Sequence, residues 1–118
     1  MKTVQYIYVL IDPRNQSIFY VGITIDTKRR INQYNRIAVR DENPLYPWSA
    51  SELRVRDIAA SGYQVVFHVV ETVVSDTWNT GYKAEKLWMA RLVNSGVKLL
   101  NVDGVKIKKS NYLLDKCV

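Results

Sequence analysis

Residues 6–23 read YIYVLIDPRNQSIFYVGI and set the architecture of the whole chain. Residues 6–11 are β-branched and aromatic, which is typical of a strand, and residues 18–23 have a similar composition. Between the two runs lie a proline, an asparagine and a serine, which favour turns. The pattern predicts an antiparallel hairpin.

Because side chains alternate along a strand, each strand of this hairpin presents two faces. We expect one aliphatic face to hold Ile7, Val9, Ile11, Phe19, Val21 and Ile23. Tyr8 and Tyr20 then fall together on the opposite face. Gly22 lies beside them and has no side chain to fill the space, so we expect a pocket-like arrangement there.

Two helices are expected next. The first begins near Asp26 or Thr27, which favour N-caps. Its apolar residues recur at helical spacing, at Ile31, Tyr34, Ile37 and Ala38. A charged pair and two prolines predict a loop over residues 41–48. Residues 49–52 form a capping box that opens the second helix, and Gly62 is placed to end it.

Residues 65–70 are the most strand-like run of the chain and predict a buried central strand, in which His68 would be a satisfied structural histidine. A third helix is expected from about residue 80 to residue 94, with Gly96 as its stop. Its inner face should carry Ala84, Leu87, Trp88 and Leu92. A short edge strand is expected at residues 99–102.

The elements follow the order strand, strand, helix, helix, strand, helix (β-β-α-α-β-α). This order predicts a small α/β sandwich, in which helices flank a central three-stranded antiparallel sheet. The length of 118 residues suits one domain, and the chain contains no internal repeat or interdomain linker.

Composition limits the classes of function. The chain carries 17 Lys and Arg residues against 11 Asp and Glu, which gives a net charge of +6 and a pI near 9.5. No apolar run reaches the roughly 18 residues of a membrane span, and the N-terminus lacks the pattern of a signal peptide. These features indicate a cytoplasmic protein with a polyanionic partner such as nucleic acid, although a solvated surface that is merely basic has the same composition.

The charge is uneven along the chain. Residues 28–56 hold seven basic and three acidic residues, and residues 98–118 hold five and two. Cys117 is the single cysteine and His68 the single histidine, which argues against a disulfide framework, a zinc module and a histidine-based triad. Any metal would have to bind oxygen ligands.

Four motifs, taken in order, resemble the GIY-YIG nuclease domain. They are residues 6–8 (Tyr-Ile-Tyr), residues 20–22 (Tyr-Val-Gly), Arg30 in the next helix, and Glu85 in a later helix ahead of Trp88. The resemblance covers roughly residues 6–102, and the order of elements read independently agrees with that fold.

The resemblance implies hydrolysis of phosphodiester bonds in nucleic acid with one divalent metal. In the family, the residues that correspond to Tyr8, Tyr20, Arg30 and Glu85 converge on the scissile phosphate. A glutamate oxygen suits Mg²⁺ or Mn²⁺, so Glu85 is the expected metal ligand. The guanidinium of Arg30 would stabilise the growing negative charge. Tyr8 is the candidate for activating the attacking water, provided that a cation lowers its pKa from about 10.

Two positions depart from the family pattern. Tyr6 replaces the first glycine, at a position that we interpret as structural. Tyr34 replaces a histidine that many members carry four residues after the arginine. Because residues four apart share a helix face, Tyr34 can still reach the site of Arg30 and is kept among the catalytic candidates. The change removes the strongest proton acceptor and leaves the general base open. Asn101 matches an asparagine that many members carry, and we expect it to support the structure.

Further residues are candidates for binding nucleic acid. They are Lys28, Arg29, Tyr46, Trp48, Arg54 and Arg56. The first two either contact phosphate or are simply solvated. The two aromatic residues either stack on exposed bases or anchor their loop to the core, and we favour the anchor. The two arginines of the second helix, together with lysines after residue 105, could extend the substrate track.

The leading hypothesis is a stand-alone, metal-dependent endonuclease that prefers DNA to RNA. Residues 1–102 would form its catalytic domain, and residues 103–118 a basic extension of it. Specificity would come from its own loops, from a homodimer or from a partner protein. The alternatives are an inactive module on the same fold that binds nucleic acid, and an adaptor that uses its basic face on an acidic protein.

Overall fold

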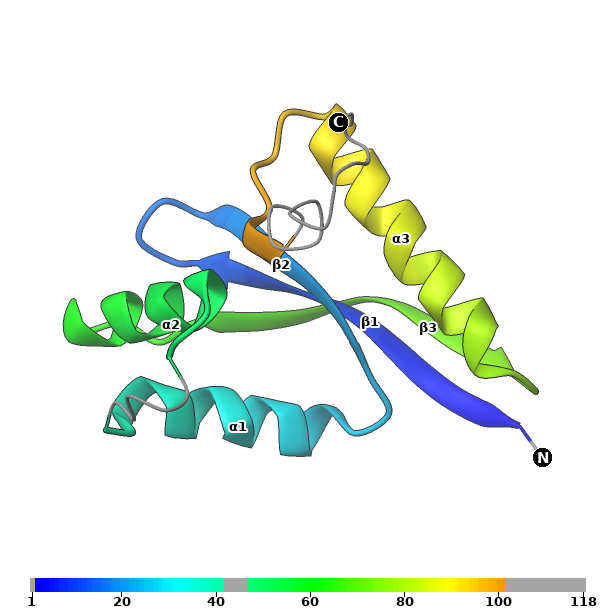
Figure 1. Cartoon of the computed structure of the whole chain (residues 1–118), viewed down its shortest axis with the longest axis horizontal. Coiled ribbons are helices and arrows are strands. Elements are labelled where there is room, and N and C mark those ends of the chain that lie inside the picture. The colour runs from blue at the N-terminus through cyan, green and yellow to red at the C-terminus, as the bar shows by residue number, and fades with distance from the viewer. Residues whose placement is uncertain (1, 42–46, 102–118) are drawn as a thin grey trace.

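The computed structural model describes residues 2–41 and 47–101. In this part of the chain the elements follow the predicted order, so the small α/β fold is confirmed. They are β1 (Thr3–Asp12), β2 (Ser17–Thr24), α1 (Thr27–Val39), α2 (Ala50–Ala60), β3 (Val66–Ser75) and α3 (Trp78–Asn94) (Figure 1). Tyr46 and the predicted extension at residues 103–118 lie outside the described residues. No helix within them combines the length and apolarity that crossing a bilayer would require.

The first two helices begin at the predicted caps, and α2 ends at the predicted glycine. Asp26 caps α1, because its side chain accepts a hydrogen bond from the backbone N–H of Arg29 at 3.0 Å. Ser49 and Glu52 complete the capping box of α2, each side chain accepting from the other residue's backbone N–H. Gly62 follows α2 with a φ of 89°, a left-handed conformation that glycine adopts without strain.

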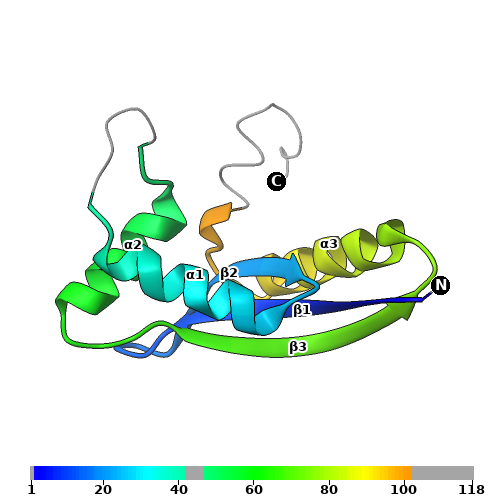
Figure 2. The same ribbon diagram turned by 90° about the horizontal axis from the view of Figure 1, so that it is seen from below.

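The three strands form one antiparallel sheet in the order β2-β1-β3. The central strand is therefore β1, and the prediction that residues 65–70 form the buried central strand is wrong. As Figure 2 shows, β3 runs beside β1 along the sheet and forms its edge. An edge strand is covered less completely than a central one. His68 is consequently exposed and is not the buried structural histidine that we predicted.

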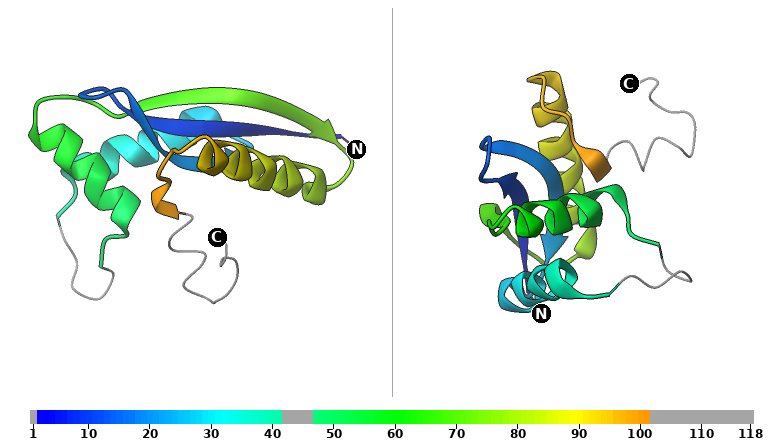
Figure 3. Two further views of the ribbon diagram at one scale, coloured as in Figure 1. Left: turned by 90° about the horizontal axis from the view of Figure 1, so that it is seen from above. Right: turned by 90° about the vertical axis from the view of Figure 1, so that its left-hand side faces the viewer.

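Each face of β1 packs into its own hydrophobic cluster. On one face, β1 contributes Tyr8 and Leu10 to a cluster with α1 and α2; its buried members also include Phe19, Tyr34, Val55 and Ile58. On the other face, Ile7 and Val9 pack with Val21, Val73 and Leu99 under α3. The two views of Figure 3 show α3 lying apart from α1 and α2. The sheet thus separates two helical layers, α1 and α2 on one face and α3 on the other.

A β-bulge in β2 changes the predicted faces of the hairpin. Leu10 pairs with Tyr20, but Ile11 pairs with Ile18, so Phe19 is the extra residue between them. Its side chain consequently packs in the cluster of Tyr8 and Leu10, and the prediction that it shares the face of Val21 is wrong. Strict alternation holds only between bulges.

Two predictions near the C-terminal helix also need correction. Leu87 is 52% exposed, whereas Met89 joins the expected Ala84, Trp88 and Leu92 against the sheet. Residues 99–102 were expected to form a strand; Leu100 and Asn101 are helical instead, and Val102 lies outside the described residues. The Asn101 amide donates a hydrogen bond to the carbonyl of Val21 at 2.8 Å, which is a structural contact of the kind expected.

A buried carboxylate ties the hairpin turn to α2. Asp12 is 1% exposed and accepts hydrogen bonds from Arg14 Nε at 3.0 Å, Arg14 NH2 at 2.8 Å and Arg54 Nε at 2.9 Å. The bond from Arg14, with further help from Arg54, holds the pKa of Asp12 well below its usual range. Arg54 also stacks over the Phe19 ring, with its Cζ atom 5.0 Å from the ring centroid. Charge pairing and packing therefore fasten α2 to the turn that follows β1.

We predict that Arg54→Ala lowers the free energy of unfolding by about 1–3 kcal/mol, because it removes a charged hydrogen bond from a buried carboxylate. Asp57→Asn changes only the exposed partner of Arg14 and serves as the control, with a much smaller effect. Since the pKa of Asp12 is lower in the folded state, the stability that the pair contributes is complete above the unfolded-state pKa of about 3.9. It is lost as the pH falls below that value. Urea unfolding at pH 7 and pH 3 measures both effects; equal losses for the two variants at pH 7 would contradict this account.

Candidate active site

Tyr8 is the most deeply buried of the predicted site residues. It lies in the middle of β1 with no exposed surface, opposite Gly22 on β2, and its ring stacks on Phe67 at a centroid distance of 4.3 Å. A Cβ atom added to Gly22 would overlap the phenol ring. The space beside Gly22 is therefore filled by Tyr8 itself and is not the pocket that we expected from the sequence.

Three phenols gather at this point. The hydroxyl groups of Tyr8 and Tyr34 lie 2.8 Å apart and share a hydrogen bond. The ring of Tyr20 lies 6.2 Å from that of Tyr8, centroid to centroid. Tyr34 reaches the cluster from α1, so the residue that replaces the family's histidine is in direct contact with the first tyrosine of the motif.

Arg30 and Glu85 approach the same phenols from α1 and α3. The positive charge of Arg30 lowers the pKa values of Tyr8, Tyr20 and Tyr34, and the negative charge of Glu85 raises those of Tyr8 and Tyr20. A charge has these effects only at short range in a partly buried site. The structure therefore gathers the three phenols of Tyr8, Tyr20 and Tyr34, and it places the charges of Arg30 and Glu85 where they act on the pKa of Tyr8 and Tyr20.

Burial keeps these phenols neutral. Desolvation is the largest influence on the pKa of Tyr8, Tyr20 and Tyr34 and raises all three above the usual range. Arg30 acts in the opposite direction but does not overcome it. The Tyr8 phenol is therefore protonated near neutral pH. To act as a base, as predicted, it needs a further cation that lowers its pKa.

Glu85 is a half-buried carboxylate. Desolvation raises its pKa, and Lys86 opposes that effect only in part. In the part of the chain that the structure describes, no Lys or Arg side chain forms an ion pair with it. A carboxylate in this position gains stability from a nearby cation.

The donor set suits one hard divalent ion held loosely by protein. Residues 2–41 and 47–101 contain no cluster of three or more His, Cys, Asp or Glu side chains arranged to hold a metal. Mg²⁺ typically binds through one or two carboxylates and keeps several waters, which phosphate oxygens can replace. Glu85 fits that mode of binding. The described residues do not provide the ligands of a closed, zinc-type site.

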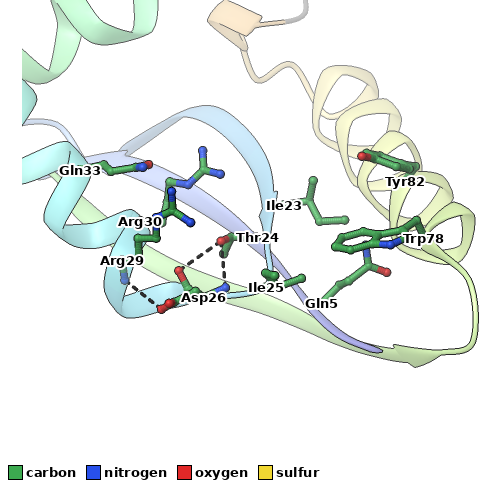
Figure 4. A pocket seen from close by; sticks show the side chains of 10 residues that line it. All are labelled: Gln5, Ile23, Thr24, Ile25, Asp26, Arg29, Arg30, Gln33, Trp78 and Tyr82. Carbon is green, nitrogen blue, oxygen red and sulfur yellow. Dashed lines mark hydrogen bonds between the residues drawn. The ribbon is translucent and has the colours of Figure 1, made fainter. Parts of the chain in front are cut away.

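A cavity of about 280 Å³ lies between α1 and α3, and Arg30 is one of the residues that line it (Figure 4). Arg29 and Arg30 line it from α1, and Trp78 and Tyr82 line it from α3. Sequence analysis had not singled out the two aromatic residues. Their spacing of four residues on one helix, just before Glu85, was the available signal.

Most of the predicted nucleic-acid contacts in α2 and the preceding loop have intramolecular partners. Arg40 and Arg56 both lie over the Trp48 ring, with their Cζ atoms 4.5 and 4.7 Å from its centroid. Arg56 also donates hydrogen bonds to the carbonyl groups of Ile37 and Arg40. These contacts support the anchor interpretation of Trp48, and Arg54 is held by Asp12 as described above.

Lys28 and Arg29 differ from that group. Both are exposed in the first turn of α1, next to Arg30, and neither side chain forms an ion pair within the described residues. Their predicted contact with phosphate remains a prediction, and their position beside the phenol cluster is compatible with it.

Comparison with known proteins identifies the class. The family model of the GIY-YIG catalytic domain matches residues 4–95, and the chain belongs to this family. It is therefore an endonuclease, a hydrolase of phosphodiester bonds. Neither the curated proteins nor the solved structures gave a match to this chain.

We predict that Gly22→Ala lowers the free energy of unfolding by about 1–3 kcal/mol, because the new methyl group forces the Tyr8 ring out of a filled site. Tyr8→Leu alone leaves a cavity, but in the double variant the smaller side chain relieves the overlap. The double-mutant cycle should therefore show a favourable coupling of about 0.5–3 kcal/mol. Chemical denaturation of the four proteins measures it, and additive losses would show that the two residues do not constrain each other.

Proposed function

We propose that this endonuclease is metal-dependent, that it cuts DNA in preference to RNA, and that Glu85 holds the metal. One observation supports the proposal most directly: Glu85, a half-buried carboxylate with no ion pair among the described residues, acts on the pKa of Tyr8 and Tyr20, the same two phenols whose pKa Arg30 lowers. Each group matches a part of phosphodiester hydrolysis. The net charge of +6 favours a polyanionic substrate.

Each side chain has a distinct role in this proposal. Mg²⁺ or Mn²⁺, bound at Glu85, would supply Lewis-acid activation of the phosphate. Arg30 presents a planar, permanently charged fork to phosphate oxygens and stabilises the charge that grows on them during hydrolysis. Arg30 lies on α1 and acts on the phenols. It forms no ion pair among the described residues, so its guanidinium group is available to the phosphate.

The tyrosines position the attacking water. The Tyr34 hydroxyl fixes the orientation of the Tyr8 hydroxyl through their shared hydrogen bond. A neutral phenol both donates and accepts a hydrogen bond, so Tyr8, which itself has no exposed surface, acts on the attacking water through the Tyr34 hydroxyl. Tyr20 completes the wall beside the phosphate. A divalent cation held by Glu85 would add its positive charge to that of Arg30 and would lower the pKa of Tyr8, which is the direction that proton removal requires.

Two further expectations accompany the proposal. Lys28 and Arg29 extend the phosphate track along the start of α1. A homodimer or a partner protein would supply specificity, since the predicted DNA contacts in α2 are largely engaged inside the molecule.

We predict that Arg30→Ala lowers the rate of plasmid nicking about 100-fold or more, because a preorganised charge at the reacting phosphate is lost. Arg36→Ala changes an exposed arginine of the same helix and is the matched control, with little effect expected. Single-turnover nicking of supercoiled plasmid with Mg²⁺ or Mn²⁺ measures both, with an RNA strand of related sequence for comparison.

Faster cleavage of the RNA than of DNA would contradict the preference for DNA. Binding to plasmid without nicking in either metal would contradict the catalytic proposal and favour the inactive nucleic-acid-binding module instead.

Glu85→Gln should separate stability from activity. In EDTA at pH 8 we expect the variant to be at least as stable as the wild type, because the desolvated charge is gone. The pKa of Glu85 is raised in the folded state, so its penalty is complete above the folded-state pKa and disappears below the unfolded-state value of about 4.3. The advantage of the variant should therefore vanish at pH 4. Circular dichroism melts at both pH values measure it.

Adding Mg²⁺ should raise the melting temperature of the wild type and not that of Glu85→Gln, which should also fail to nick DNA. Glu71→Gln is the control, because Glu71 is exposed on β3 and the amide keeps the oxygen that accepts from Trp88. An equal response of Glu85→Gln and wild type to Mg²⁺ would remove Glu85 as the metal ligand.

A further inference from the structure

The cavity between α1 and α3 contains a buried amide with no visible partner. Gln5 lines the cavity from β1 and has no exposed surface, yet neither its amide nitrogen nor its amide oxygen has a hydrogen-bond partner among the described residues. Leaving both atoms unsatisfied is costly, and native proteins rarely do so. This amide is therefore the strongest sign that something polar enters the cavity.

The backbone of α3 is adapted to this side chain. A Cβ atom added to Gly81 would overlap the Gln5 amide, so glycine at this position lets the helix close over it. An apolar residue at position 5 would have avoided the unsatisfied atoms altogether. An amide presents a donor and an acceptor side by side, which matches the edge of a nucleobase.

Two aromatic side chains stand at the same end of the cavity. Trp78 and Tyr82 are 51% and 50% exposed and lie one turn apart on α3. Figure 4 shows the Gln5 amide beside the Trp78 ring, with Arg29 and Arg30 across the cavity. Exposed aromatic rings are the usual platform on which unpaired bases stack. A half-exposed indole can also rotate and open the amide to a ligand.

The cavity shares one residue, Arg30, with the proposed catalytic groups. Arg30 lines it and also acts on the phenols, and Tyr82 lies three residues before Glu85 on α3. A nucleotide whose phosphate lies at Arg30 would therefore have its base within reach of the Trp78 and Tyr82 rings.

We propose that this cavity binds one unpaired nucleobase next to the scissile phosphate, stacked on Trp78 and hydrogen-bonded by the Gln5 amide. The inference rests on the proposed function and narrows its substrate class. The preferred substrates are nucleic acids in which a nucleotide beside the cut is bulged, flipped or single-stranded.

Two fluorescein-labelled DNA duplexes test this. One carries a single bulged 2-aminopurine, and the other carries the same base paired with thymine; both are titrated with protein in EDTA. Anisotropy reports affinity, and 2-aminopurine emission reports stacking. We expect wild type to bind the bulged probe more tightly and to quench its emission.

Three variants locate the base. Trp78→Ala should weaken binding of the bulged probe about 5- to 100-fold, as expected for loss of one stacking platform. Gln5→Met removes the amide at constant length and should weaken it about 3- to 10-fold. Because Met leaves no unsatisfied polar atoms, the fold should be at least as stable as wild type. Tyr63→Ala is the control, since Tyr63 is 55% exposed and precedes β3, whereas Trp78 follows the other end of that strand.

The outcomes are distinct. Equal affinity of wild type for the two probes, or equal affinity of Trp78→Ala and Tyr63→Ala for the bulged probe, would overturn the inference. Nicking of plasmid without any preference for the bulged probe would overturn it and leave the proposed function intact. A preference that both cavity variants abolish, in a protein that never nicks DNA, would support the binding site and contradict the proposed catalysis.

Discussion

The close approach of Tyr8 and Gly22 is the contact around which the site is arranged. A phenol ring in the middle of the central strand has no exposed surface, and it fits only because the residue opposite lacks a side chain. Phe67 covers the ring from β3 and Tyr34 meets its hydroxyl from α1. β2, β3 and α1 thus all pack against the Tyr8 side chain, and its hydroxyl group is held in one position.

Negative charge is disfavoured at the same site. Burial raises the pKa of the three phenols and of Glu85, so the site disfavours negative charge in the absence of a cation. The opposite arrangement occurs at Asp12, where Arg14 and Arg54 compensate a buried carboxylate fully. Asp12 holds the fold together, whereas Glu85 is left without such a partner in the part of the chain that the structure describes, which is the condition that the proposed metal site requires.

Local signals predicted the elements well, and tertiary contacts decided the exceptions. Helix caps at Asp26 and Ser49 depend on neighbours within four residues, and both were correct. The face of Phe19 depends on the pairing of β2 with β1, because a bulge reverses alternation without any requirement for glycine. The exposure of His68 depends on strand order, since an apolar run has the same composition at the centre of a sheet and at its edge.

From the sequence alone followed the order of elements and the net charge, since periodicity and composition are local properties, and the resemblance to the GIY-YIG family supplied the candidate catalytic residues. Only the tertiary structure decided that Tyr34 bonds to Tyr8, that Arg54 and Arg56 serve the fold, and that Gln5 lies unsatisfied beside Trp78. Hydrogen bonding and desolvation arise between groups far apart in the chain, and no local pattern contains them.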